Sequence, residues 1–182
     1  MATIKYTTAD YFDRAMEVLE ESGFPALTAA GLCSTMGVTR GSFYHHFESF
    51  DDFVEKFLEH WETRYTTELI ARSISTDFAE QIRLQSAFAI GLPHNAEAAL
   101  RAWASVDPRV ADVQRRVDAV RHEGLAASLR DHGTSPDKAD LYATIALTTL
   151  VGMQVTTRPF EPAKLEKVYE ELATALITSS RL

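Results

Sequence analysis

Cysteine is almost absent from this sequence of 182 residues, in which Cys33 is the only one. A single cysteine cannot form a disulfide within the chain, and it cannot supply the cluster of thiolates that many structural zinc sites use. We therefore interpret Cys33 as a small apolar side chain on the buried face of a helix, the usual environment of a free cysteine. A reactive thiol is the less favoured alternative.

Long apolar runs and targeting signals are also lacking. No stretch approaches the roughly 20 consecutive apolar residues that a bilayer-spanning helix needs. Residues 1–10 contain neither a basic segment nor an apolar core of the kind found in secretion signals. The sequence therefore predicts a cytoplasmic protein with no membrane partner.

Motifs of catalysis and of metal binding are not found either. The sequence has no HExxH, no glycine-rich phosphate loop and no GxSxG element. His45 and His46 are adjacent on a predicted helix, so they point in different directions and make a poor metal pair. We therefore predict no catalytic residues, no metal site and no cofactor. The alternative, an enzyme assembled from scattered residues such as Asp107, Arg109 and His94, has no support from their spacing.

Positive charge is scarce. The chain has 18 lysines and arginines against 26 aspartates and glutamates, which gives a formal net charge of −8. Such a balance argues against a protein that coats nucleic acid without regard to sequence, because such proteins are usually basic. It leaves room for a site-specific DNA-binding protein, in which the charge of one face matters more than that of the whole.

What the sequence does contain is a helical pattern along nearly its whole length. Apolar residues recur at three- and four-residue steps, as at Tyr11, Ala15 and Val18, and no alternating strand pattern with hairpin turns occurs. We predict an all-α protein, in which Thr8 caps the first helix and Gly23 ends it. The nine predicted helices cover residues 8–22, 28–36, 39–46, 50–73, 77–90, 96–104, 108–132, 137–157 and 163–179.

The most informative stretch covers residues 27–53. Two short helices are separated there by a turn at residues 36–38, where a glycine allows the chain to reverse sharply. The first turn of the second helix can present Arg40, Gly41 and Ser42 outward. Small residues around one arginine suit a recognition helix that approaches the DNA major groove closely. The pattern predicts a helix-turn-helix.

The run GVTRGSFYHHFES at residues 37–49 resembles the N-terminal motif of the TetR family of transcriptional regulators. Ala15, Gly23 and Thr28 match the same pattern upstream, so that the resemblance extends over about forty-five residues. It implies a DNA-binding regulator, by our prediction a repressor, that binds a palindromic operator in double-stranded DNA as a homodimer. The predicted DNA-binding residues are Thr28, Thr39, Arg40, Gly41, Ser42, Tyr44 and His45.

The sequence departs from this pattern at Phe50, where the family commonly carries a lysine that reaches a phosphate. We interpret Phe50 as a core contact or a hydrophobic staple. Within residues 1–50 the bases Lys5, Arg14 and Arg40 face six acids, a balance of −3. Most of these acids lie along the first helix, one face of which can hold them away from DNA. The alternative function is a helical dimeric interaction module whose helix-turn-helix has been reused for contact with protein.

The C-terminal half contains the features expected of a pairing surface. The predicted helix over residues 137–157 is apolar nearly all round and must be covered on both sides, while the helix over 163–179 carries a matching apolar stripe. We predict a homodimer through these two helices, the eighth and ninth of the chain. The predicted domains are a DNA-binding domain at residues 1–48 and a ligand-binding and dimerisation domain at residues 49–182.

A ligand site is also predicted among the helices of the second domain. The groups expected to orient a ligand are Gln85, His94 and Arg121, and the ligand itself is expected to be a small, largely apolar effector of unknown identity. The alternative is that aromatic residues at helical spacing simply form the core. The predicted lining residues are Trp61, Tyr65, Phe88, Trp103, Val117, Arg121 and Tyr142.

Overall fold

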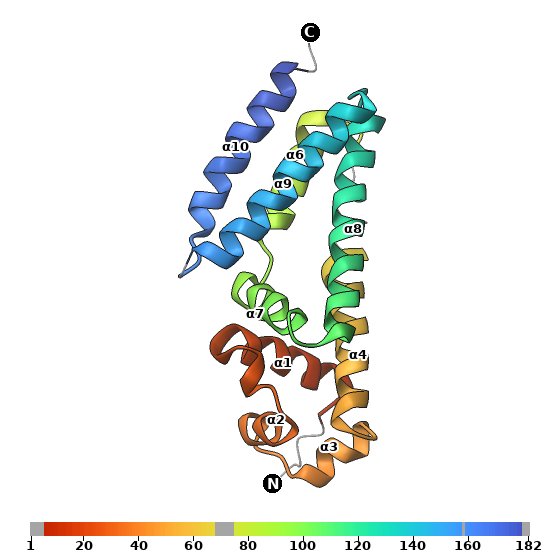
Figure 1. Ribbon diagram of the computed structural model, residues 1–182, viewed down its shortest axis with the longest axis vertical. Coiled ribbons are helices and arrows are strands. Elements are labelled where there is room, and N and C mark those ends of the chain that lie inside the picture. Colours follow the sequence, from red (N-terminus) through yellow and green to blue (C-terminus); the bar gives the residue numbers. More distant parts are fainter. Residues whose placement is uncertain (1–5, 68–74, 158, 180–182) are drawn as a thin grey trace. The chain divides into compact units, whose positions relative to one another are not determined.

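The computed structural model describes residues 6–67, 75–157 and 159–179. Over these residues the chain forms nine α-helices and no strand (Figure 1), which confirms the predicted all-α class. None of the helices described is long and apolar enough to cross a membrane. The helices are α1 (Thr8–Ser22), α2 (Ala29–Met36), α3 (Arg40–His46), α4 (Phe50–Glu62), α6 (Phe78–Ile90), α7 (His94–Ala104), α8 (Pro108–Asp131), α9 (Pro136–Thr156) and α10 (Pro162–Ser179).

Side-chain caps begin several of these helices at the positions that the sequence indicates. Thr28 caps α2, Thr39 caps α3 and Asp77 caps α6, each by accepting a hydrogen bond from a backbone N–H of the first turn. The predicted cap of α1 is wrong by one residue, because Thr7 and not Thr8 takes this position. Asp10 lies three residues after Thr7, and its carboxylate accepts a hydrogen bond from the Thr7 N–H at 2.6 Å, which completes a capping box.

The predicted helix over residues 50–73 is a regular α-helix only in its first part. α4 ends at Glu62, and a π-helical turn follows over Thr63–Thr67. Residues 68–73 lie outside the described residues. Three of the five residues in the π turn are threonines, whose β-branched side chains lose rotamer freedom in a regular helix. Apolar spacing, on which the prediction of one long helix rested, does not detect such a change of turn type.

α7, which corresponds to the helix predicted over residues 96–104, begins at His94, two residues before the predicted start. Pro93 precedes the helix and offers no side-chain cap. Glu20 of α1 supplies one instead: its carboxylate accepts hydrogen bonds from Asn95 Nδ2 at 2.8 Å and from the Ala96 N–H at 2.7 Å. An acid at a helix N-terminus also interacts favourably with the helix dipole. A contact between distant parts of the sequence therefore sets this boundary.

The chain divides into two compact units that do not follow the order of the sequence. Unit 1 comprises residues 1–62 and 93–114, and unit 2 comprises residues 63–92 and 115–182. Within unit 1, α7 packs along α1, and α2 also contacts α1. The functional boundary predicted between residues 48 and 49 is a separate question and stays a prediction.

Aromatic rings of α1, α3 and α4 form much of the core of unit 1. Phe53 is fully buried, with its ring centroid 5.0 Å from that of Phe47 and 5.6 Å from that of Phe43. Tyr11, also fully buried, lies 5.8 Å from Phe43 and 5.5 Å from Phe47, with the ring planes nearly perpendicular. Edge-to-face contacts of this kind suit the charge distribution of aromatic rings. They fix α3 and α4 against α1.

Unit 2 contains two buried apolar clusters. α10 lies beside α9 and also packs on α6 (Figure 1). The apolar stripe predicted for the last helix is therefore largely covered within the same chain. Buried members of the first cluster are Ala89, Leu92, Leu150, Leu165 and Tyr169, and those of the second are Ile82, Leu129, Ala139 and Leu176.

Candidate functional site

The turn between α2 and α3 has the conformation that its glycine predicts. Gly37 has a φ of 65°, in the left-handed region that L side chains rarely adopt. Val38 N–H donates to Cys33 O at 2.9 Å, and Gly37 N–H donates to Ser34 O at 3.3 Å, which satisfies the last carbonyls of α2. The predicted helix-turn-helix is therefore present, with α3 as its second helix.

The two faces of α3 are clearly different. Phe43 and Phe47 point into the aromatic core, whereas Tyr44 exposes 52% of its surface. Leu32 and Cys33 of α2 are buried as predicted, and Val38 is half-buried. The outward face of α3 also exposes Arg40, Gly41 and His45.

Cys33 has the inert environment that we inferred for it. Its thiol donates a weak hydrogen bond to Thr39 O at 3.7 Å. Burial raises the pKa of the Cys33 thiol, and the nearby charge of Arg40 opposes this only in part. A thiol with a raised pKa contains little thiolate at neutral pH and reacts slowly.

Three of the predicted DNA-binding residues already make hydrogen bonds within unit 1. The hydroxyls of Thr28 and Thr39 accept hydrogen bonds from the Gly31 and Ser42 N–H groups, at 3.0 and 3.3 Å. The Ser42 hydroxyl lies 3.1 Å from the hydroxyl of Tyr11, in a part-buried position. Ser42 therefore connects the first turn of α3 to the core. A contact from Ser42 to a phosphate, which we predicted, would have to share this hydroxyl.

Gly41 has no structural reason to be a glycine. A Cβ atom built there meets only the Thr39 hydroxyl oxygen, at 3.6 Å, which is an ordinary van der Waals contact. Its φ is not in the left-handed region either. Glycine is unfavourable inside a helix relative to alanine, by about 0.5–1 kcal/mol. The fold thus tolerates a side chain at position 41, and α3 presents an exposed position without one.

Three of the five acids of α1, the helix whose charge argued against DNA binding, have partners within unit 1. Asp10 caps its own helix, and its hydrogen bonds with Thr7 lower the pKa of the Asp10 carboxyl. Glu17 pairs with Arg14 at 2.5 Å, and Glu20 caps α7. These three carboxylates therefore have partners on α1 and α7.

Phe50, the departure from the family's pattern, contributes to the core. Its ring stacks on that of Phe53, with the centroids 5.6 Å apart and an angle of 26° between the planes. The start of α4 is capped by Ser49, whose hydroxyl accepts a hydrogen bond from the Asp52 N–H at 3.0 Å. Lys56, one turn further along, is paired with Asp52 at 2.9 Å. The interpretation of Phe50 as a core contact is confirmed.

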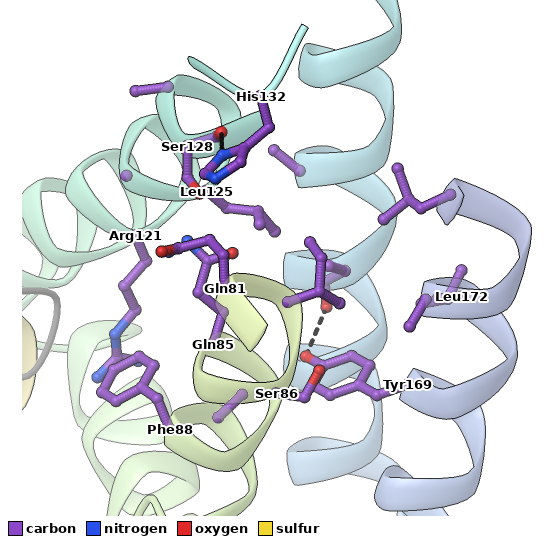
Figure 2. A pocket seen from close by; sticks show the side chains of 18 of the residues that line it. Gln81, Gln85, Ser86, Phe88, Arg121, Leu125, Ser128, His132, Tyr169 and Leu172 are labelled. Atoms are coloured by element: carbon purple, nitrogen blue, oxygen red, sulfur yellow. Dashed lines mark hydrogen bonds between the residues drawn. The ribbon is translucent and has the colours of Figure 1, made fainter. Parts of the chain in front are cut away.

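Unit 2 encloses a cavity of about 620 Å³ between α6, α8, α9 and α10. This volume lies within the range of small-molecule sites, which is typically about 300–1,000 Å³. Figure 2 shows that its polar groups come mainly from α6 and α8, among them Gln85, Arg121 and Ser128. The opposite wall, from α9 and α10, is largely aliphatic, with Tyr169 as its polar side chain; the Tyr169 hydroxyl donates to Ala146 O at 3.0 Å.

Two of the seven predicted ligand-binding residues line this cavity, namely Phe88 and Arg121. Gln85, expected to orient a ligand, lines it as well. Tyr65 is not among the lining residues, but its backbone oxygen accepts a hydrogen bond from Arg121 Nη2 at 3.0 Å. Val117 is fully buried in unit 2 without lining the cavity, and Tyr142 packs against the cluster around Leu129.

The remaining predictions fall in unit 1. Trp61 is fully buried there, and Trp103 stacks on Phe24 with their ring planes at 6°. His94 is the first residue of α7 and is buried in the same unit. For the two tryptophans, burial in a core is the alternative that the sequence left open. Neither they nor His94 are among the residues that line the cavity.

Several lining residues were not predicted, and they share a common feature. They come from small or aliphatic positions of α9 and α10, or from polar positions of α6 and α8, all of which are compatible with an ordinary core or surface. Aromatic side chains, which guided the prediction, are few in the lining. The lining residues that sequence reasoning missed include Gln81, Ser128, His132, Leu147, Tyr169, Leu172 and Leu176.

Comparison with known proteins agrees with the helix-turn-helix. Residues 12–56 match the sequence model of the bacterial regulatory proteins of the TetR family. No curated protein matches the sequence. Because the matched residues run from α1 into α4, they include the whole helix-turn-helix and the supporting rings of Phe12 and Phe53, while Tyr11 lies one residue before the match.

Solved structures share the fold over almost the entire chain. A transcriptional regulator from Rhodococcus sp. Rha1 is 19% identical, with a TM-score of 0.79 over 96% of this chain and 97% of that one. A TetR transcription regulator from Haloarcula marismortui is 20% identical, with a TM-score of 0.73 over 92% and 98%. A regulator from Saccharomonospora viridis, solved in complex with choline, is 14% identical, with a TM-score of 0.76 over 92% and 95%.

The N-terminal region, over residues 12–56, is therefore similar to the DNA-binding domain of TetR-family regulators. The similar structures show that the helices described here have the fold of such proteins.

The hydrogen bond between Tyr11 and Ser42 yields a prediction about α3. Tyr11→Phe keeps the ring contacts and removes the hydroxyl, and Ser42→Ala removes the other partner. A double-mutant cycle, measured by urea unfolding, is expected to give a coupling of about 0.5–1.5 kcal/mol, because each single variant leaves the same hydrogen bond unmade. Tyr44→Phe, which changes an exposed hydroxyl of the same helix, is the control and should show no coupling to Ser42→Ala. Additive effects of Tyr11→Phe and Ser42→Ala would contradict the contact.

Proposed function

We propose that this protein is a homodimeric transcriptional repressor that binds a palindromic operator through α3 and is released by a small, largely apolar effector held in the cavity of unit 2. In this proposal residues 1–48 bind DNA, and residues 49–182 carry ligand binding and dimerisation. The observation that carries the proposal is the outward face of α3, where exposed side chains surround a glycine that the fold does not require.

The α3 face has the composition of a surface that reads DNA. Arg40 is exposed at the first turn and supplies a planar group that can donate two hydrogen bonds to a guanine edge. Tyr44 and His45 are exposed on the same helix and can donate to phosphates, which fix the register of the protein on DNA. The lack of a side chain at Gly41 lets the backbone of α3 come close to the floor of the groove.

The acids of α1 bear on the alternative function, an interaction module that contacts protein. A carboxylate close to DNA repels the phosphates, so acids near α3 would weaken DNA binding. Asp10, Glu17 and Glu20 have partners at Thr7, at Arg14 and at the start of α7, and none of them lies on α3. This arrangement favours DNA over a protein partner.

The dimer is proposed from the exposed face of α9. Leu141, Ile145 and Val155 expose 55%, 36% and 53% of their surfaces, and the four- and ten-residue steps between them place these side chains on one side of the helix. Large aliphatic side chains in such a row are typical of a protein–protein contact. A two-fold pair would bury the row against its own copy and would present two recognition helices to successive turns of DNA.

Two of the similar structures support the idea that the cavity of unit 2 takes a small molecule. One was solved in complex with choline, and another, from Bacillus halodurans, is a fatty acid degradation regulator named FadR. Both are under 20% identical to this chain, so they support a ligand in the helical body and leave its chemistry open.

The proposal is tested first by selecting bound fragments from a random duplex library at low and then at physiological salt. A two-fold-symmetric sequence is expected to survive the higher salt. Arg40→Ala should weaken binding to that sequence by about 1–3 kcal/mol, because one base contact is lost. Arg83→Ala removes an exposed arginine of unit 2 that is paired with Glu80, and it should leave the affinity unchanged. Recovery of no symmetric sequence would favour the protein-contact alternative.

Gly41→Ala separates function from folding at the same position. The variant should be as stable as the parent or more stable, by up to about 1 kcal/mol in urea unfolding, because alanine restricts the unfolded chain and fits the available space. Operator affinity should nevertheless fall by at least about tenfold, corresponding to about 1.4 kcal/mol, because the added methyl group keeps α3 away from the groove. An alanine variant that binds the operator as tightly as the parent would show that α3 does not approach DNA at this residue.

Leu141→Glu tests the proposed pairing surface. Two copies of the charge would lie at a two-fold interface, so the dimer is expected to dissociate at concentrations at which the parent remains paired. Sedimentation velocity measures the state directly. Val106→Glu is the matched control, since Val106 is 68% exposed and belongs to unit 1. A Leu141→Glu variant that remains dimeric would place the interface elsewhere.

A further inference from the structure

Among the uncharged side chains that line the cavity of unit 2, two have a buried atom with no hydrogen-bond partner among the described residues. These atoms are Oε1 of Gln85 on α6 and Oγ of Ser128 on α8. An unsatisfied buried polar atom costs about 1–3 kcal/mol. Both residues line the cavity, and Figure 2 shows the Gln85 side chain extending from α6 toward the wall that carries Ser128. A ligand in the cavity can satisfy both atoms.

Neighbouring polar groups of the lining already have partners within unit 2. Gln81 Oε1 accepts a hydrogen bond from the Ser75 N–H, and His132 Nδ1 is 2.9 Å from Ser128 O. The guanidinium of Arg121 donates to Tyr65 O and lies over the ring of Phe88, 6.0 Å from its centroid. Gln85 and Ser128 thus offer a ligand an amide oxygen and a hydroxyl, both uncharged, beside the buried charge of Arg121.

The charge of the lining distinguishes among possible head groups. Arg121 is only 7% exposed and keeps a positive charge at the cavity wall, while Asp131, the lining carboxylate, is exposed. A quaternary ammonium would therefore meet a buried cation. A carboxylate would pair with Arg121, but it can only accept hydrogen bonds and would leave Gln85 Oε1, which needs a donor, unsatisfied. An uncharged group that both donates and accepts fits the two atoms.

The opposite wall determines the rest of the ligand. Apart from Tyr169, it consists of alanine and leucine side chains, among them Leu147, Leu150 and Leu172, so that its surface is mainly aliphatic. An aliphatic chain fills such a space by dispersion contacts and by removing apolar surface from water. The ligand is thus polar at the α6–α8 side and aliphatic at the α9–α10 side.

We infer that the cavity of unit 2 takes an uncharged aliphatic amphiphile, an alcohol or a primary amide, whose head group donates to Gln85 Oε1 and shares a hydrogen bond with the Ser128 hydroxyl. This inference rests on the proposed function, because it gives the chemical class of the effector that releases DNA.

The test uses probes that share one chain and differ only in the head group. Octan-1-ol and octanamide are expected to bind the full-length protein in calorimetry more tightly than octanoate or octyltrimethylammonium. Octyl methyl ether accepts a hydrogen bond but cannot donate one, so it should bind about 5- to 150-fold more weakly than octan-1-ol, the equivalent of about 1–3 kcal/mol. The same series with ten-carbon chains checks that the order does not depend on chain length.

Variants connect this preference to the two atoms. Gln85→Leu should bring the ratio of octan-1-ol to octyl methyl ether affinity to about one, since the acceptor is removed while the apolar wall remains. Ser128→Ala should reduce the affinity for octan-1-ol and for octanamide. Ser86→Ala makes the same chemical change at another residue of the lining and should leave the ratio as in the parent. Circular dichroism and urea unfolding identify any variant that is not folded. If Gln85→Leu is not folded, Gln85→Glu takes its place. The Gln85→Glu variant should bind octan-1-ol and octanamide more tightly than octanoate.

Two results would overturn the inference: tighter binding of octanoate or octyltrimethylammonium than of octan-1-ol, or an alcohol-to-ether ratio that Gln85→Leu does not change. Absence of binding by all of the probes would overturn it as well. Each of these outcomes is independent of the duplex selection, which needs no effector. A protein that selects a palindrome and rejects the uncharged probes would keep the proposed function and lose only the effector class.

Discussion

The exposed face of α3 depends on the burial of one side chain, Tyr11. α3 has seven residues, well below the roughly 12–15 that an isolated helix needs in water, so its conformation must come from packing. The ring of Tyr11 contacts Phe43 and Phe47 on the inner face of α3, and its hydroxyl meets Ser42 at the first turn. Because α1 holds Tyr11 with no exposed surface, the geometry of α1 sets that of the recognition helix. The outward residues of α3 are therefore not needed to stabilise the helix.

Glu20 connects the same helix to α7. Its carboxylate caps the start of α7. Near its other end, α1 contacts α3 through Tyr11. Two helices of unit 1, α3 and α7, are therefore positioned by side chains of this one helix. The acidity of α1, which looked unfavourable for DNA binding, includes the group that makes this connection.

Local signals explain what could be predicted from the sequence. Thr28 and Thr39 as caps and Gly37 at the turn depend on residues at most a few positions away, and the family motif adds the order in which they occur. Boundaries that depend on distant residues were missed: α7 starts early because Glu20 reaches it, and no spacing rule contains that contact. The π turn at Thr63–Thr67 changes the backbone without changing the apolar pattern. The apolar pattern therefore predicts one regular α-helix over residues 50–73, whereas α4 ends at Glu62. The predicted cap of the first helix, Thr8, is one residue late, because the hydrogen bond from the Thr7 N–H to Asp10 fixes the cap at Thr7.

The cavity was harder to predict because a cavity and a core use the same residues. Trp61 and Trp103 have the helical spacing and the size expected of a ligand site, yet their neighbours fill the space around them in unit 1. In unit 2 the opposite holds, since Ala143, Ala146 and Ala173 stand on α9 and α10 where larger side chains would close the gap to α6 and α8. The space is thus produced by small residues on one pair of helices, and its chemistry by polar residues on the other pair. Neither pattern is distinctive on a single helix, and the site exists only where the four helices meet.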